Sequence, residues 1–193
     1  MGRGIIVVLV VLAGCDLGHP GELVGEMNVT ASLRENNCGT AVGTVPATAD
    51  THVKFYERAG VLTWMGSLGT FLAEIDEEGN FVFRSSGSQV LRAEQPDGWG
   101  GVLAACTVNA AEEIRGKLVR RVSFDADAAD GTAEPEDGGE TEPATPASVI
   151  ATDTLQVAPA SGSDCADFVG SGTGLFQALP CRVILDLSGS EED

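Results

Sequence analysis

Apolar and polar residues alternate along most of this chain, and this pattern constrains its fold more than any other sequence feature. Successive side chains of a β-strand point to opposite faces, so alternation predicts strands with one buried face. The clearest run spans 23–33, where alternate positions hold Leu23, Met27, Val29, Ala31 and Leu33. Similar patterns occur at 53–56, 105–124, 148–157 and 181–187.

A β-hairpin is predicted at residues 71–83. Alternate apolar residues stand on both sides of its turn: Phe71, Ala73, Ile75, Phe81 and Phe83. Between them lies the polar, glycine-containing cluster 76–80, which is typical of a hairpin loop. We therefore expect these two strands to pair with each other.

The fold class follows from these strands and from the lack of any apolar stripe with helical period. Turn-separated strands without intervening helices favour an all-β antiparallel sandwich or barrel, here of about eight strands. The 193-residue chain is long enough for one domain with a real core. We expect that single all-β domain to span 22–189, with a short acidic tail at 190–193.

One stretch, 125–147, breaks the pattern and is expected to form a long disordered acidic loop between two paired strands. It contains no large apolar residue and no positive charge, so burial cannot offset its ordering entropy. The spacing of Asp125, Asp127 and Asp130 weakly resembles a calcium loop, but Ala129 occupies a ligand position. We interpret the stretch as a solvated loop and expect no metal site there.

The formal net charge of -18 argues against nucleic acid as a partner, because an acidic surface repels phosphate backbones. It would equally repel anionic lipid headgroups. Any attachment to a membrane must therefore come from an anchor.

The amino terminus has the pattern of an export signal. Arg3 precedes the apolar run 5–13, which is far shorter than the roughly 20 residues that a transmembrane helix needs. Leu12, Ala13, Gly14 and Cys15 follow in order and resemble the lipobox of bacterial lipoproteins.

This resemblance implies that a lipid is attached to the Cys15 thiol and that the chain is cut before Cys15. Residues 1–14 would then be a signal peptide and 15–21 a lipidated tether carrying fatty-acyl chains such as palmitate. The mature protein would be held on the periplasmic or outer face of a bacterial membrane. The remainder is loosely similar to uncharacterised cell-envelope lipoproteins, which implies no activity.

Four cysteines remain besides Cys15, and an even number in an exported domain predicts two disulfides. They are Cys38, Cys106, Cys165 and Cys181. Of three possible pairings, we favour Cys165 with Cys181, because a loop near 15 residues gives about 3 kcal/mol by chain entropy. Cys38 would then pair with Cys106. A zinc site has little support, because the chain has no Cys-x-x-Cys and only two histidines.

No catalytic constellation is visible, so we expect neither an enzyme nor a cofactor. A hydrolase would need His52 beside a nucleophile, and we interpret His52 as a surface residue at a strand start. The glycine-rich stretch 170–174 lacks the strand-to-helix context of a phosphate site. The aromatic residues are most simply core, although Trp99 lies in a loop and is a candidate for an exposed contact.

Two functions remain. The first is a membrane-anchored, non-catalytic protein of the cell envelope that binds or scaffolds a partner. The alternative is a lipocalin-like carrier of an apolar small molecule inside a β-barrel. A cavity lined by the phenylalanines would favour the carrier, whereas a filled core would favour binding or scaffolding.

Overall fold

The computed structural model describes residues 21–43, 45–67, 69–120, 146–170 and 174–191. Most of them are in strands, joined by turns and one short 3-10 turn at Ala166–Phe168. Among these residues, no helix has the length and apolar character that crossing a membrane requires. The strands are β1 (Glu22–Asn36), β2 (Thr48–Arg58), β3 (Val61–Gly66), β4 (Gly69–Glu74), β5 (Asn80–Arg92), β6 (Gln95–Pro96), β7 (Val102–Leu103), β8 (Cys106–Arg120), β9 (Pro146–Pro159) and β10 (Cys181–Ser190).

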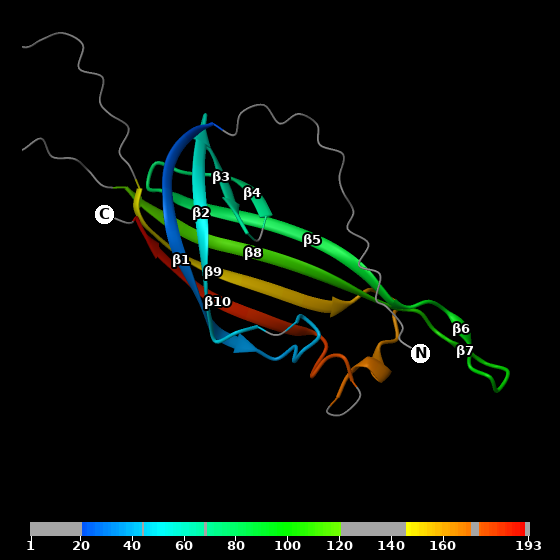
Figure 1. The fold of residues 1–193 in the computed structure, drawn as a ribbon. Coiled ribbons are helices and arrows are strands. Elements are labelled where there is room, and N and C mark those ends of the chain that lie inside the picture. Colours follow the sequence, from blue (N-terminus) through cyan, green and yellow to red (C-terminus); the bar gives the residue numbers. More distant parts are fainter. Residues whose placement is uncertain (1–20, 44, 68, 121–145, 171–173, 192–193) are drawn as a thin grey trace, which may run out of the picture.

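Eight strands form one antiparallel sheet in the order β4-β3-β2-β1-β10-β9-β8-β5. The sheet curls until its two edges, β4 and β5, nearly meet (Figure 1). A bridge between Ile75 and Phe81 joins these edges at one end, so the barrel is almost closed. The predicted all-β class with about eight strands is confirmed.

The hairpin predicted at 71–83 is wrong in its pairing, although its turn is present. Asp76 Oδ1 accepts a hydrogen bond from the Asn80 backbone N–H at 2.7 Å, as expected of a tight turn. Gly79 has a φ of 85°, a conformation that glycine adopts without steric cost. Beyond the single bridge the strands diverge, since β4 pairs with β3 and β5 pairs with β8. The local signal predicted the turn, but tertiary packing chose the partners.

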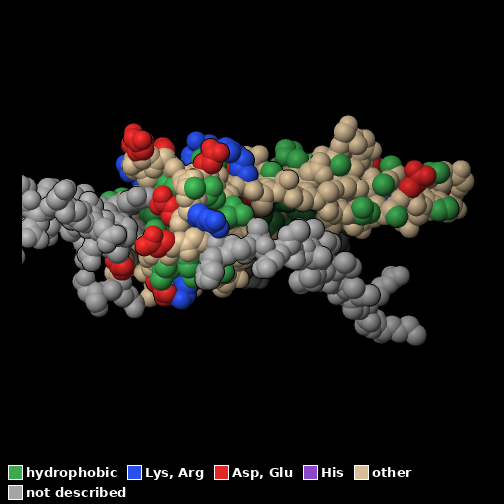
Figure 2. Space-filling view, turned by 90° about the horizontal axis from the view of Figure 1, so that it is seen from above, with side chains coloured by type: hydrophobic (Ala, Val, Ile, Leu, Met, Phe, Trp, Pro, Cys, Tyr) green, Lys and Arg blue, Asp and Glu red, His purple; other side chains and the backbone are tan. Residues whose placement is uncertain are grey.

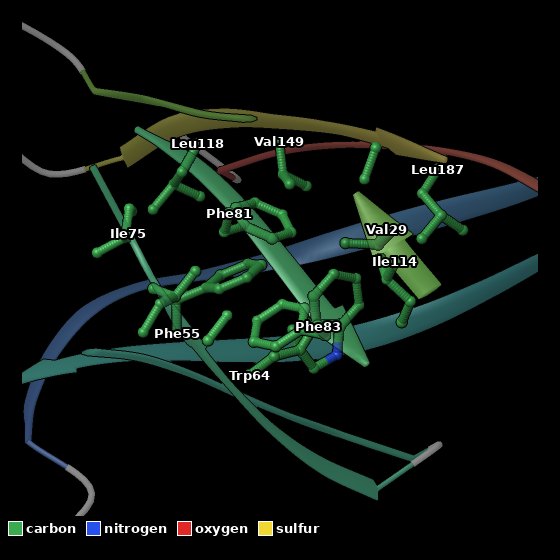
Figure 3. Close-up of a cluster of buried hydrophobic side chains, with 14 of the residues drawn as sticks. Val29, Phe55, Trp64, Ile75, Phe81, Phe83, Ile114, Leu118, Val149 and Leu187 are labelled. Atoms are coloured by element: carbon green, nitrogen blue, oxygen red, sulfur yellow. The ribbon is translucent and has the colours of Figure 1, made fainter. Parts of the chain in front are cut away.

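Aromatic side chains fill the interior beside the β4–β5 junction (Figure 3). Phe55, Trp64, Phe81 and Phe83 are each at most 2% exposed. Phe55 meets Trp64 edge-on with ring centroids 5.2 Å apart, and Trp64 meets Phe83 in the same way at 6.0 Å. Such edge-to-face pairs are favoured by the quadrupoles of the rings. These residues are core, as expected.

The disulfide count is confirmed, but the favoured pairing is wrong. Cys38 is bonded to Cys181 and Cys106 to Cys165, with Cα–Cα distances of 5.0 and 4.9 Å. Both bonds lie in a second buried cluster at the other end of the sheet, with Val108, Val157, Phe176 and Val183 among its members.

Strand register explains why the expected pairs, Cys165 with Cys181 and Cys38 with Cys106, do not form. Asn36 on β1 stands opposite Val183 on β10; two residues further on, this register places Cys38 opposite Cys181. Likewise, the Asp164 backbone N–H donates to the Ala105 carbonyl at 3.0 Å, which sets the next residues, Cys165 and Cys106, side by side. Proximity along the chain was a poor guide, because the sheet joins segments that are far apart in sequence.

Candidate functional site

The expected lipidation site lies outside the described residues. This applies to Cys15, to the lipobox residues Leu12, Ala13 and Gly14, and to most of the acidic loop with Asp125, Asp127 and Asp130. The described chain begins at Gly21 and enters β1 at Glu22, opposite Glu57 near the end of β2. In Figure 1 this point lies at the opposite end of the molecule from β6 and β7.

A two-stranded arm, residues 93–104, projects beyond the main sheet. Its strands β6 and β7 pair with each other and prolong β5 and β8 (Figure 1). The carboxylate of Asp97 accepts hydrogen bonds from the backbone N–H groups of Trp99 and Gly101, at 2.7 and 2.8 Å. These bonds order the loop that carries Trp99.

The arm exposes large apolar side chains to solvent. Trp99 is 94% exposed, and Val102 and Leu103 are also exposed, as is Val90 just before the arm. Figure 2 shows hydrophobic side chains spread along this extension. Single exposed apolar residues are ordinary, but several together on a projection are typical of an interaction site. The expectation that Trp99 is an exposed residue is confirmed.

Arg92 holds the root of the arm in place. Its side chain is only 10% exposed, and its guanidinium donates to the carbonyls of Ala104 and Asp164, each at 2.8 Å. It also pairs with the Asp167 carboxylate and lies 5.6 Å from the centre of the Phe168 ring. The Cys106–Cys165 disulfide lies next to these contacts, because Arg92 is paired with Cys106 across β5 and β8. The base of the arm is therefore fixed to the main sheet by both the arginine and the disulfide.

Two carboxyl groups face the concave side of the sheet between the two buried clusters. Asp153 on β9 alternates with the buried Val149 and Ala151, so it points inward, and it is 8% exposed. Its Oδ1 has no hydrogen-bond partner. Glu112 on β8 shares this face and accepts a 2.8 Å hydrogen bond from Ser85 Oγ on β5.

Burial and, to a smaller extent, the nearby charge of Glu112 together raise the pKa of Asp153 to about 7. Asp153 therefore keeps its proton to a higher pH than an ordinary carboxyl group does. Within the described chain, Glu112 has no basic partner. This arrangement can hold a proton near neutral pH, or it can pair with a cationic group brought by a ligand.

Sequence reasoning missed this acidic pair, although a signal was present. The run 148–157 alternates Val149, Ala151, Asp153, Leu155 and Val157 at its inward positions. A carboxyl group at an inward position of an otherwise apolar face is uncommon, because burying it carries a cost. The acidic residue at an inward position of this run could therefore have identified Asp153 as a candidate site residue.

His52 lies on the convex face, away from both features. Its Nε2 is 3.2 Å from the Glu26 carboxylate and its Nδ1 is 3.3 Å from the Asn28 amide oxygen. Glu26 also accepts a hydrogen bond from Lys54 at 2.6 Å. Neither of these two neighbours carries a hydroxyl or thiol group, so they do not form with His52 the hydroxyl–imidazole or thiol–imidazole pair of a serine or cysteine hydrolase.

The edge of β5 that faces away from β8 is open to solvent. Beyond the bridge at Phe81, the described residues supply no strand that pairs with this edge. Every residue from Arg84 to Val90 is exposed. A cleft of about 620 Å³ marks the place where β4 and β5 separate, and Leu72, Glu74, Phe81 and Arg84 are among the residues that line it.

No protein-family model matches this chain, and neither a curated protein nor a solved structure does so. A role for this protein therefore has to be argued from the arm, the concave acidic pair and the amino-terminal motif.

Proposed function

We propose that this protein is a lipid-anchored, non-catalytic binding protein of the bacterial cell envelope. Acylation of Cys15 would hold it to a membrane by a tether over 15–21, and more than one acyl chain makes such anchoring stable. The two disulfides support an extracytoplasmic location, because such bonds form and persist in oxidising compartments.

The exposed apolar arm is the observation that carries the binding role. Tryptophan is enriched among the residues that dominate binding energy at protein interfaces. Trp99 stands at the end of an arm held by Arg92, on a loop whose backbone is bonded to Asp97, so a partner would meet a loop whose backbone is already ordered. Such preorganisation reduces the entropic cost of association.

The position of the arm suits an anchored protein. The described chain starts at the end of the sheet opposite the arm (Figure 1), and the proposed tether precedes that start. The arm would thus extend away from the attached membrane. We infer that its partner is a protein of the envelope with an apolar surface, rather than the membrane that holds the lipid.

The carrier alternative has weaker support. The nearly closed barrel is compatible with it, but the phenylalanines that might have lined a cavity instead pack against one another and Trp64. A filled core favours the binding or scaffolding role over the carrier. Solvent extraction of the purified protein, followed by lipid analysis, tests the carrier function. An apolar molecule recovered in stoichiometric amount would support the carrier over the binding role.

Site-specific photocrosslinking in cells tests the role of the arm. A photoreactive residue in place of Trp99 should give a discrete covalent adduct with a partner. The matched control places the same residue at Ile150, which is 64% exposed on β9 and outside the arm. Adducts at both positions alike, or at neither, would contradict the proposal.

A further inference from the structure

The free edge of β5 is unusually unprotected for an edge strand. Natural edge strands are commonly blunted by lysine, proline, a bulge or short length. From Arg84 to Val90 this edge contains Arg84, two pairs of small or polar residues around Gly87, and no proline or lysine. The one irregularity in its pairing with β8 lies at its far end, between Val90 and Arg92.

The opposite edge does not cover it. β4 has only six residues and meets β5 at the Ile75–Phe81 bridge, whereas β5 continues past it toward the arm (Figure 1). Within the described part of the chain, the outer backbone groups of β5 beyond Phe81 therefore present a row of donors and acceptors without a pairing strand. An extended peptide recognises such a row by adding a strand.

The concave side of this edge is also shaped for a long side chain. Ser85 and Gly87 are the inward residues of β5 here, and a Cβ placed on Gly87 would meet no atom within 4 Å. Ser85 stands directly opposite Glu112, and Gly87 opposite Ala110. These small residues leave a path from the free edge across β5 to the Glu112 carboxylate.

An unmatched acidic pair lies at the end of this path. Glu112 has no basic partner in the described chain, and the Oδ1 of Asp153 behind it is buried without a hydrogen bond. Strands are spaced by about 4.8 Å, so an added strand would lie about 10 Å from β8. A lysine or arginine on that strand can span this gap together with the glutamate side chain.

We propose that the free edge of β5 takes up an extended segment of a partner protein, with a lysine or arginine of that segment directed to Glu112 and Asp153. This inference rests on the proposed binding role and names the partner's chemistry: an extended, basic stretch. A second copy of this chain fits less well, because its net charge of -18 opposes self-association.

A peptide-binding experiment with the full chain in detergent tests this inference independently of the anchor and of Trp99. The probe is a labelled peptide as long as the free stretch of β5, alternating threonine and valine around one central lysine. The control peptides replace that lysine with norleucine or glutamate. We expect the lysine peptide to bind at least about tenfold more tightly than either control, since a charge pair shielded from water can contribute this much.

Glu112→Gln and Glu113→Gln form a matched pair of variants, because these neighbours lie on opposite faces of β8. Glu113 is on the convex face and pairs with Arg84 and Arg115. Glu112→Gln should abolish the preference for lysine, whereas Glu113→Gln should preserve it. An equal effect of both substitutions would overturn the proposed path.

Amide hydrogen exchange on the wild-type protein locates the bound peptide without any variant. Binding should slow exchange along β5 between Val82 and Val90. Binding that leaves these amides unprotected, or no binding of the lysine peptide, would refute the inference while leaving lipidation and arm crosslinking untouched. Concentration-dependent dimers that protect the same amides in the chain alone would also refute it, because a second copy would then occupy the edge.

Discussion

At the scale of single residues, Asp153 is the clearest departure from a stable core. It stands between Ile114 and Leu185 on the neighbouring strands, which offer no hydrogen bond to its carboxyl group. Burying an unpaired carboxylate costs free energy, and the group responds by keeping its proton to higher pH. The protein therefore retains a group that weakens its fold at neutral pH, as sites that bind a ligand often do.

Stability should fall as the pH rises through the range in which only the folded state keeps the Asp153 proton. The unfolded chain releases that proton near pH 3.8 and the folded protein near pH 7. Between these values the unfolded state binds fewer protons, so the free energy of unfolding decreases with pH. We expect a loss of about 3 kcal/mol between pH 5 and pH 8, measured by urea denaturation.

Asp153→Asn should remove most of this dependence, because the amide does not ionise. Asp186→Asn is the matched control, since Asp186 is about half exposed and pairs with Arg34 on the surface. That variant should retain the wild-type slope. Equal slopes for wild type and Asp153→Asn would show that another group governs stability in this range.

Gly116 is a second residue whose identity matters. A Cβ at this position would lie 2.5 Å from the Ala151 Cβ and 2.7 Å from the Phe81 ring. Gly116→Ala should destabilise the fold by about 1–3 kcal/mol through overpacking, measured by thermal or urea denaturation. Gly87→Ala is the control, because that site is open, and its effect should stay within about 0.5 kcal/mol. Equal effects at the two sites would show that crowding is not the cause.

At the scale of elements, alternation located the strands but did not determine their partners. The run 71–75 became β4 with β3 as its neighbour, while 81–83 entered β5 with β8 as its neighbour. The residues that the pattern assigned to the core do face it: Ala73, Ile75, Phe81 and Phe83 are buried, and Phe71 is partly buried against them. Which strands pair depends on how the whole sheet curls around its core. A short stretch of sequence does not contain that information.

The disulfides give a direct check of the strand register. Mass mapping of the non-reduced protein should recover peptides that link Cys38 to Cys181 and Cys106 to Cys165. A peptide linking Cys165 to Cys181 would contradict the arrangement of β1 and β10.

Removing a disulfide should lower stability according to the loop that it closes. The Cys106–Cys165 bond spans 59 residues and the Cys38–Cys181 bond 143. The chain-entropy relation gives about 4 and about 5 kcal/mol, respectively. Double serine variants at each pair, unfolded in urea, should follow this order, with the loss of Cys106–Cys165 also loosening the arm. A negligible loss in the free energy of unfolding for either variant would mean that the removed disulfide does little to restrict the unfolded chain.

At the scale of the whole molecule, the proposed anchor and the arm lie at opposite ends of one sheet. Cys15→Ser should leave an unprocessed or soluble protein in place of a lipidated one. Membrane fractionation and electrophoretic mobility measure this, with the double serine variant at Cys106 and Cys165 as a control for a general effect of cysteine loss. Unchanged fractionation of Cys15→Ser would remove the support for the envelope assignment.

The sequence alone determined the class of fold, the positions of most strands, the number of disulfides and the exposure of Trp99. These features are encoded locally, by the period of the hydrophobic pattern, by turn residues and by the count of cysteines. Tertiary structure alone decided which strands pair, which cysteines bond, that β5 keeps a free edge, and that Asp153 and Glu112 share one face. Those outcomes depend on contacts between segments distant in the chain, and the free energy of such contacts is set only when the sheet curls around its core.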